Sequence, residues 1–340
     1  MRLLLSLLLL LLSISAVDGQ TADGLNGNTY TLRDLGNGVH TLTWNPKRGT
    51  FAIGNSTFIV GDDDVIVVDT GFYVASAEAI LGALRTITAK PVSFVINTHW
   101  HSDHIFGNQV FRKAFPSARF VAHPATREGI VTGESDNRDA KRPTTLARID
   151  ELQAKATRSD AENQELHRAR MQIEAWEGDY LLPDLLVDGK LTILQGKRQV
   201  DVVHLGEANT KGDVVVHLPA ERVAISGDIA ITPVQFASGS SPRRWVETLG
   251  RLGALDAAVI VPGHGPAQTD MRFITDLQTM LRSLVEQVDA GIRAGLTLER
   301  LKQTVKLTPP PGSVYEKVSA GVLDAMFRSP AIESAFNEKG

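Results

Sequence analysis

INTHWHSDHIFGN, residues 96–108, ends an apolar run and places three histidines and one aspartate within six positions. His99 and His101 are two residues apart, so their imidazoles share one side of an extended or looped backbone but not of a helix. Asp103 and His104 are neighbours and must point elsewhere. The pattern predicts two metal positions, and imidazole with carboxylate suits zinc, or less readily iron or manganese. The alternative is a histidine-rich surface loop.

The surrounding sequence places this stretch in an α/β fold. A helical period over 75–88 is followed by the strand PVSFVINT, residues 91–98. The metal-binding residue types come directly after that strand, where loops of α/β proteins commonly carry function. We therefore expect a site at a sheet edge.

Two later strands end in residues that could complete such a site. Asp228 closes RVAISGD, and His264 lies in VPGHGP after another apolar run. A glycine next to each allows close backbone approach. Either residue alone could belong to a turn, but together with the first motif they are candidate ligands.

The rest of the chain predicts one domain over residues 20–340. Residues 28–70 have the alternation and turns of short strands, and the chain from Met271 onward is mostly of helical period. Between about Gly133 and Leu182 the sequence becomes charge-rich, which predicts one or two exposed helices inserted into the domain. This insertion is either a packed decoration or a substrate lid. No repeat or low-complexity linker divides the chain.

The composition and the N-terminal sequence limit the cellular compartments and the binding partners that we expect for this protein. Residues 1–19 combine Arg2, a leucine-rich run and small residues, which predicts a secretory signal peptide, since the run is shorter than the about 20 residues of a membrane span. An uncleaved anchor is the alternative. With a signal peptide and no cysteine, we expect a periplasmic or secreted protein without disulfides and without stable membrane association after cleavage. A net charge of -4 with mixed signs argues against nucleic acid as a partner. A small-molecule substrate is expected, and the oligomeric state is left open.

These motifs, taken in order, resemble the metallo-β-lactamase superfamily. HWHSDH matches its H-x-H-x-D-H signature, and VVDTG, ANTKGD, SGD and PGHG match its further conserved regions, over residues 30–265. In more detail the chain resembles the exported branch associated with quinoprotein relay systems and nearby β-lactamase-like hydrolases. The resemblance implies a four-layered αββα sandwich with the metal site at one edge of the two sheets.

The resemblance also implies a role for each site residue. His99 and His101 would bind a first zinc, and Asp228 would bridge it to a second. Asp69 would orient one of the metal ligands without binding the metal itself. The ligands implied for the second zinc are Asp103, His104 and His264.

Asn209 departs from the family pattern, because it stands where a histidine is expected to be the third ligand of the first zinc. An amide oxygen is a weaker zinc donor than imidazole, so the first site should lose affinity and one-zinc operation is expected. Alternatively, Asn209 only binds a water and another residue ligates. The nearest other histidine is His204, which, with His123 and His217, is expected to be structural within strands. His40 and His167 are expected to be ordinary polar positions.

Such a site predicts hydrolysis, since zinc lowers the pKa of a bound water from about 15.7 to about 7 and polarises a carbonyl under attack. Asp103 or Asp228 would hold or move the proton. The expected activity is β-lactamase-like ring opening. The alternatives are hydrolysis of another ester, lactone, thioester, phosphodiester or sulfate ester, or a non-catalytic metal-binding module that serves a periplasmic dehydrogenase. The insertion and Phe51 are expected to shape the substrate pocket.

Overall fold

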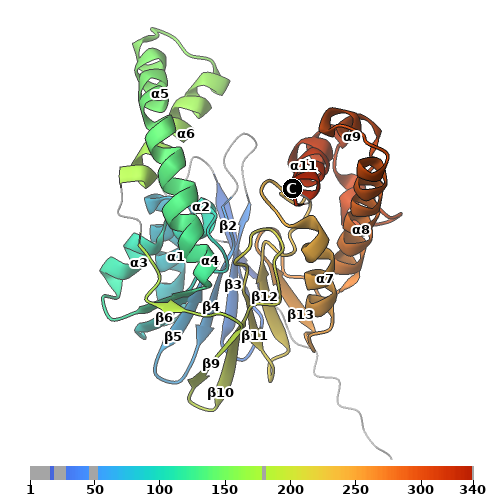
Figure 1. The fold of residues 1–340 in the computed structure, drawn as a ribbon. Coiled ribbons are helices and arrows are strands. Elements are labelled where there is room, and N and C mark those ends of the chain that lie inside the picture. Colours follow the sequence, from blue (N-terminus) through green and yellow to red (C-terminus); the bar gives the residue numbers. More distant parts are fainter. Residues whose placement is uncertain (1–15, 19–27, 46–52, 178–180, 339–340) are drawn as a thin grey trace, which may run out of the picture.

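The computed structural model describes residues 16–18, 28–45, 53–177 and 181–338, which form two β-sheets between layers of helices (Figure 1). Phe51 lies outside these residues, as does most of the predicted signal peptide. Within the described part of the chain, no helix combines the length and apolar character that a membrane crossing requires.

The first sheet has eight strands in chain order. It begins as an antiparallel meander and becomes parallel from β5 onward, where helices make the crossovers. Its strands are β1 (Ala16–Asp18), β2 (Thr29–Asp34), β3 (Val39–Asn45), β4 (Ser56–Val60), β5 (Val65–Val68), β6 (Val92–Ile96), β7 (Arg119–Ala122) and β8 (Leu185–Leu186).

The second sheet has five strands in the order β13-β12-β11-β10-β9. Only β12 and β13 run parallel, joined by a helical crossover. The strands are β9 (Lys190–Gln195), β10 (Arg198–Val203), β11 (Val215–Leu218), β12 (Val223–Gly227) and β13 (Val259–Pro262).

The two sheets pack face to face through alternate residues of their strands. On β5, Ile66 and Val68 point into a core between the sheets, where they meet residues such as Val202 and Val216 of the second sheet. Val65 and Val67 point the other way, into a core under helices. Because both faces of β5 are buried, its sequence is a continuous apolar run rather than an alternating one.

Helices cover the outer face of each sheet and complete four layers. Over the first sheet lie α1 (Val74–Ile87), α2 (Ser102–Ile105), α3 (Asn108–Ala114) and α4 (Pro124–Gly129). Over the second lie α7 (Pro242–Gly253), α8 (Arg272–Arg293), α9 (Leu298–Thr304), the 3-10 turn η2 (Val314–Lys317), α10 (Ala320–Leu323), the π-helical turn η3 (Asp324–Arg328) and α11 (Ser329–Asn337). The predicted αββα sandwich is confirmed.

The charge-rich segment forms a pair of helices that rises from the sheet layers at one side of the molecule (Figure 1). After the π-helical turn η1 (Ile130–Glu134), it consists of α5 (Ser135–Ala154) and α6 (Asp160–Glu177). Ile149 and Leu166 join the core over the first sheet, while most of the charged residues stay outside. The pair is therefore anchored by an apolar base next to the sheet.

His123 does not lie within a strand as predicted. The structure ends β7 at Ala122 and begins α4 at Pro124, with His123 as the residue that caps the helix. Proline at the first helical position has the required φ and needs no backbone donor there, which explains the early end of the strand.

Candidate metal centre

The candidate site lies where the parallel strands of both sheets end. Asp69 follows β5, and His99 and His101 follow the neighbouring strand β6, whose end is in register with that of β5. Asp228 and His264 follow β12 and β13, which form the parallel pair of the other sheet. Since parallel strands finish at one edge, these residues, distant in sequence, converge at the edge of the sandwich.

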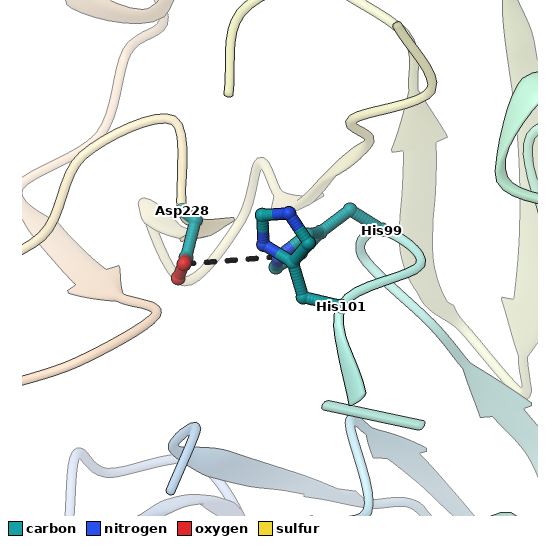
Figure 2. Close-up of side chains that lie close together, drawn as sticks. All are labelled: His99, His101 and Asp228. Atoms are coloured by element: carbon teal, nitrogen blue, oxygen red, sulfur yellow. Dashed lines mark hydrogen bonds and ion pairs between the residues drawn. The ribbon is translucent and has the colours of Figure 1, made fainter. Parts of the chain in front are cut away.

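The first group of metal-binding side chains is His99, His101 and Asp228, whose ligand atoms all lie within 4.8 Å of one another. His99 Nε2 is 3.0 Å from His101 Nδ1 and 3.7 Å from Asp228 Oδ2. Figure 2 shows the two imidazoles and the carboxylate pointing toward one another from opposite loops. This geometry could hold one metal ion.

The second group is Asp103, His104 and His264, again within 4.8 Å. His264 Nε2 lies 3.0 Å from Asp103 Oδ2 and 3.4 Å from His104 Nε2. Two side chains of α2 and one from the loop after β13 therefore face one point, and this group could hold a second ion.

Asp228 faces both groups. Its Oδ2 is on the side of His99, while its Oδ1 is 3.3 Å from His104 Nε2 and 3.6 Å from His264 Nε2. Gly263 permits this position, because a Cβ there would come within 1.9 Å of Asp228 Oδ1. The carboxylate is placed as a bridge between two ions would be.

Asp69 fixes the orientation of a histidine in each group. Its Oδ2 lies 2.8 Å from His104 Nδ1 and accepts the Thr98 hydroxyl at 2.7 Å. A carboxylate only accepts, so His104 Nδ1 carries the hydrogen and Nε2 presents a lone pair. Thr98 has given its one hydrogen to Asp69, so its oxygen accepts from His99 Nδ1, 3.0 Å away. His99 Nε2 therefore also presents a lone pair to the site.

The backbone of Asp69 adopts a left-handed conformation, with φ of 59°. This conformation is uncommon for residues other than glycine, although aspartate and asparagine tolerate it. It is held because the Asp69 carboxylate also accepts the Thr98 backbone N–H at 2.8 Å. Local strain is retained where it positions functional side chains.

The chemistry of the converging atoms fits a metal ion. Asp228 Oδ1 is buried with no hydrogen-bond donor among the described residues, and it lies 3.3 Å from the lone pair of His104 Nε2 and 3.6 Å from His264 Nε2. Burial lowers the pKa of His104, but the carboxylates of Asp103, Asp228 and Asp69 outweigh burial and raise it well above its usual value. Buried lone pairs of this kind need a cation, either a proton or a metal ion.

The charge states also suit metal binding. Burial raises the pKa of Asp103 and of Asp228, but a proton on His104, which is one of the two cations that its buried Nε2 can take up, outweighs burial together with His264 and lowers both values, so the carboxylates are ionised. Burial, followed by the charges of His104 and His101, lowers the pKa of His99 well below its usual value. His99 is therefore neutral, which is the form that binds metal.

Asn209 lies in the loop between β10 and β11 and is linked to the first group through Phe236. Its Nδ2 donates to the Phe236 carbonyl at 2.5 Å, and the Phe236 ring packs edge-on against His101 at 5.7 Å between centroids. Its Oδ1 is buried without a hydrogen-bond partner in the described part of the chain. Metal ligation by Asn209 stays a prediction, and the unpartnered oxygen is the observation that favours it.

Asp213 is a buried acid near the site that sequence reasoning missed. Its Oδ2 accepts the Thr210 backbone N–H at 2.7 Å, which closes the loop that carries Asn209. Burial, and then the negative charge of Asp228, raise the pKa of Asp213 to about 8. Its position in ANTKGD offered the only sequence signal.

The remaining histidines belong to neither of the two groups. His204 follows β10 rather than lying within it; its Nδ1 donates to the Asp213 carbonyl at 2.9 Å, and its ring stacks on His123 at 4.2 Å. The predicted strand location of His123 and His204 is thus wrong, although His217 does lie in β11. His40 lies in β3 and His167 in α6.

A cavity of about 750 Å³ opens onto the candidate ligands His101, Asp103, Asp228 and His264. The insertion contributes Lys141 and Gln172, and the C-terminal part contributes Met326. Most of the wall is apolar, formed by Trp44, Ile53, Phe72, Trp100, Ile231, Pro233, Val234, Phe236 and Met326. The site is therefore a polar floor under apolar walls.

A sequence model for the metallo-beta-lactamase superfamily matches residues 49–264. The chain belongs to the metallo-beta-lactamase superfamily. The predicted membership is thereby confirmed, and the matched region contains all the residues of both metal-binding groups.

The proteins similar to this chain include enzymes named alkylsulfatases. The chain is 28% identical over 269 residues to a linear primary-alkylsulfatase of a Pseudomonas species, and it spans about half of that protein, 49%, with 74% of its own length. A stereoselective inverting sec-alkylsulfatase from Pseudomonas shares the fold, with a TM-score of 0.61 at 17% identity over 90% of this chain and 50% of that one. A metallo-beta-lactamase from Pontibacter korlensis has a TM-score of 0.53 at 19% identity over 74% of this chain and 99% of that one.

Proposed function

We propose that this superfamily hydrolase cleaves sulfate esters of apolar alcohols. The observation that carries the proposal is the cavity, in which a metal-binding floor lies under a wall of aromatic and aliphatic side chains. An alkyl chain fits against the wall while the ester lies over the floor. The similarity to an alkylsulfatase supports the same substrate class.

Each side chain of the site has a role in this proposal. His99, His101 and Asp228 would hold one zinc ion, with Asn209 as a weak fourth donor. The ligands of a second zinc would be Asp103, His104 and His264. Bound zinc would acidify a water molecule and withdraw electron density from the ester.

The carboxylates of the floor would handle the proton. Asp103 Oδ2 is engaged by His264 at 3.0 Å, which leaves Oδ1 to accept a proton from the attacking water. Asp228 is less suited to accept this proton, because each of its two oxygens faces one of the metal-binding groups and would bind a metal ion there. The apolar wall, including Trp100 and Phe236, would exclude bulk water from the ester.

Turnover of alkyl sulfates by zinc-loaded protein tests the proposal. Release of inorganic sulfate should be abolished by chelation and restored by zinc. Along a series from butyl to dodecyl sulfate, kcat/KM should rise by about fourfold for each added methylene that the cavity buries, since each contributes about 0.8 kcal/mol. Metal-loaded protein that cleaves no member of the series would refute it.

Lactam ring opening is the second candidate. The match to the superfamily model and the similar fold of a metallo-beta-lactamase both favour it. A chromogenic cephalosporin assayed with the same metal-loaded protein separates the two. The apolar wall favours the alkyl ester, so the cephalosporin should show the lower kcat/KM. The opposite order would reverse the assignment.

We also propose that the protein is exported and acts on small molecules, as the pattern in residues 1–19 and the balanced charge suggest. Fractionation of cells that express the full chain, with N-terminal sequencing of the product, tests export. Recovery of the uncleaved chain from the cytoplasm would exclude it.

A further inference from the structure

Lys141 is the only lysine or arginine among the described residues that line the cavity. It lies on α5, the first long helix of the insertion. The other charged groups of the lining, Asp103 and Asp228, are acids of the metal-binding floor. A single cation on an otherwise apolar and acidic wall has a clear potential partner in an anionic substrate.

The ammonium group of Lys141 is not occupied by the protein. It makes no ion pair within the described part of the chain, whereas the next residue, Arg142, lies 3.4 Å from Glu177. Arg148, two turns further along α5, lies 2.7 Å from Glu165 and 2.6 Å from Glu151. Lys141 therefore differs from its neighbours on the helix in having three donors available.

The insertion places further basic side chains next to the cavity. A second hollow of about 490 Å³ lies between α5 and α6 and shares Lys141, Ser102 and Gln172 with the metal cavity. Its lining adds Arg148 and Arg168 but only one carboxylate, that of Glu165. Three basic side chains and one carboxylate therefore line this second hollow, and Lys141 lies where it meets the metal cavity.

We propose that Lys141 binds the anionic group of the substrate and makes the enzyme selective for anionic amphiphiles over neutral esters of the same chain length. The inference rests on the proposed function for the location of the reacting ester, over the metal-binding floor. Lys141 is then a specificity-determining residue supplied by the helical insertion, which acts as part of the substrate site as well as a packed decoration.

Equilibrium binding tests the inference, with two anions that cannot be hydrolysed and one neutral ester of matching chain length. Calorimetry with zinc-loaded protein would compare decyl sulfonate, decanoate and the neutral methyl decanoate. In Lys141→Gln the dissociation constant for the anions should rise about tenfold, the worth of a charged hydrogen bond, while that for the neutral ester stays unchanged. Lys141→Arg should restore most of the affinity.

Arg142→Gln is the matched control, since it removes an adjacent charge of the same helix that lines neither hollow, and it should leave all three affinities unchanged. An unaltered sulfonate affinity in Lys141→Gln would overturn the inference, as would an equal loss for the neutral ester. A loss of affinity for the sulfonate alone, or for both anions, supports the inference and shows which anionic head groups Lys141 binds. If the wild type binds sulfonate through Lys141 but cleaves no alkyl sulfate, the proposed function fails and the binding role of Lys141 stands.

Discussion

The two metal-binding groups differ in how firmly their side chains are held. In the second group, His104 is fixed directly by Asp69 at 2.8 Å, and Asp103 meets His264 at 3.0 Å. In the first group, His99 is linked to Asp69 only through the Thr98 hydroxyl. The same short motif thus supplies two sites with different support.

The first group is also weaker in its donors. Asn209 stands where the superfamily pattern has a histidine ligand for the first group, and an amide oxygen is a poorer zinc ligand than imidazole. Asp228 is the one strong donor that both groups share. We therefore expect the second group to bind metal more tightly than the first, and four substitutions test this difference.

Removal of the shared carboxylate has the largest expected effect. In Asp228→Ala both groups lose a ligand, so metal affinity should fall more than about 100-fold at both, beyond the effect of losing an outer partner. Metal content after dialysis and the rate of hydrolysis measure it. Asp256→Ala, which removes an exposed carboxylate paired with Arg222, serves as control. Retention of one full equivalent of metal would show that Asp228 is no bridge.

Asp69→Asn comes next. Asparagine tolerates the left-handed backbone of this position, so the main change is loss of the charge that orients His104 and, through Thr98, His99. Metal affinity should fall by about 10- to 100-fold, more at the second group than at the first. Competition with a chromophoric chelator measures the affinity of each of the two groups for its metal. A larger loss of metal affinity at the first group than at the second would contradict the conclusion that Asp69 supports the second group more directly.

Asn209→His should strengthen the first group alone. An imidazole at this position supplies the donor that the superfamily pattern contains, and affinity for the weaker metal should rise about tenfold. The measurement is metal stoichiometry at limiting zinc, with Asn209→Ala as the matched variant that removes the amide oxygen. If stoichiometry is the same in all three proteins, Asn209 does not contact the metal.

Thr98→Val has the smallest expected effect. Valine keeps the shape but removes the hydroxyl that joins Asp69 to His99, so affinity at the first group should fall about threefold, near the lower end for one hydrogen bond. Affinity at the second group should not change, because His104 contacts Asp69 directly. Equal weakening of both groups would contradict the separate routes of support.

Much of this site could be expected from the sequence. His99, His101, Asp103 and His104 are close along the chain, and the local spacing alone separates them into two pairs. Asp228 and His264 could be found because each ends an apolar strand next to glycine. The helical insertion was detectable as a change in charge density.

Other features depend on contacts that no local pattern encodes. Thr98 connects Asp69 to His99 only because β5 and β6 end in register. Phe236 accepts a hydrogen bond from Asn209 across 27 residues, and Lys141 of α5 lines the same cavity as His101 and Asp228. The ends of β7 and β10 were misjudged because apolar periodicity does not mark where pairing stops.

The sequence by itself determined the residue types of the metal centre, the alternation of strands and helices, and the superfamily. These depend on local periodicity and on short spacings, which a chain carries in any conformation. Only the tertiary structure decided that Asp228 faces both groups, that Asp69 supports them unequally, and that the insertion supplies a cation to the cavity above them. The physical reason is that these properties arise from distances across the two sheets, fixed when their apolar faces pack together.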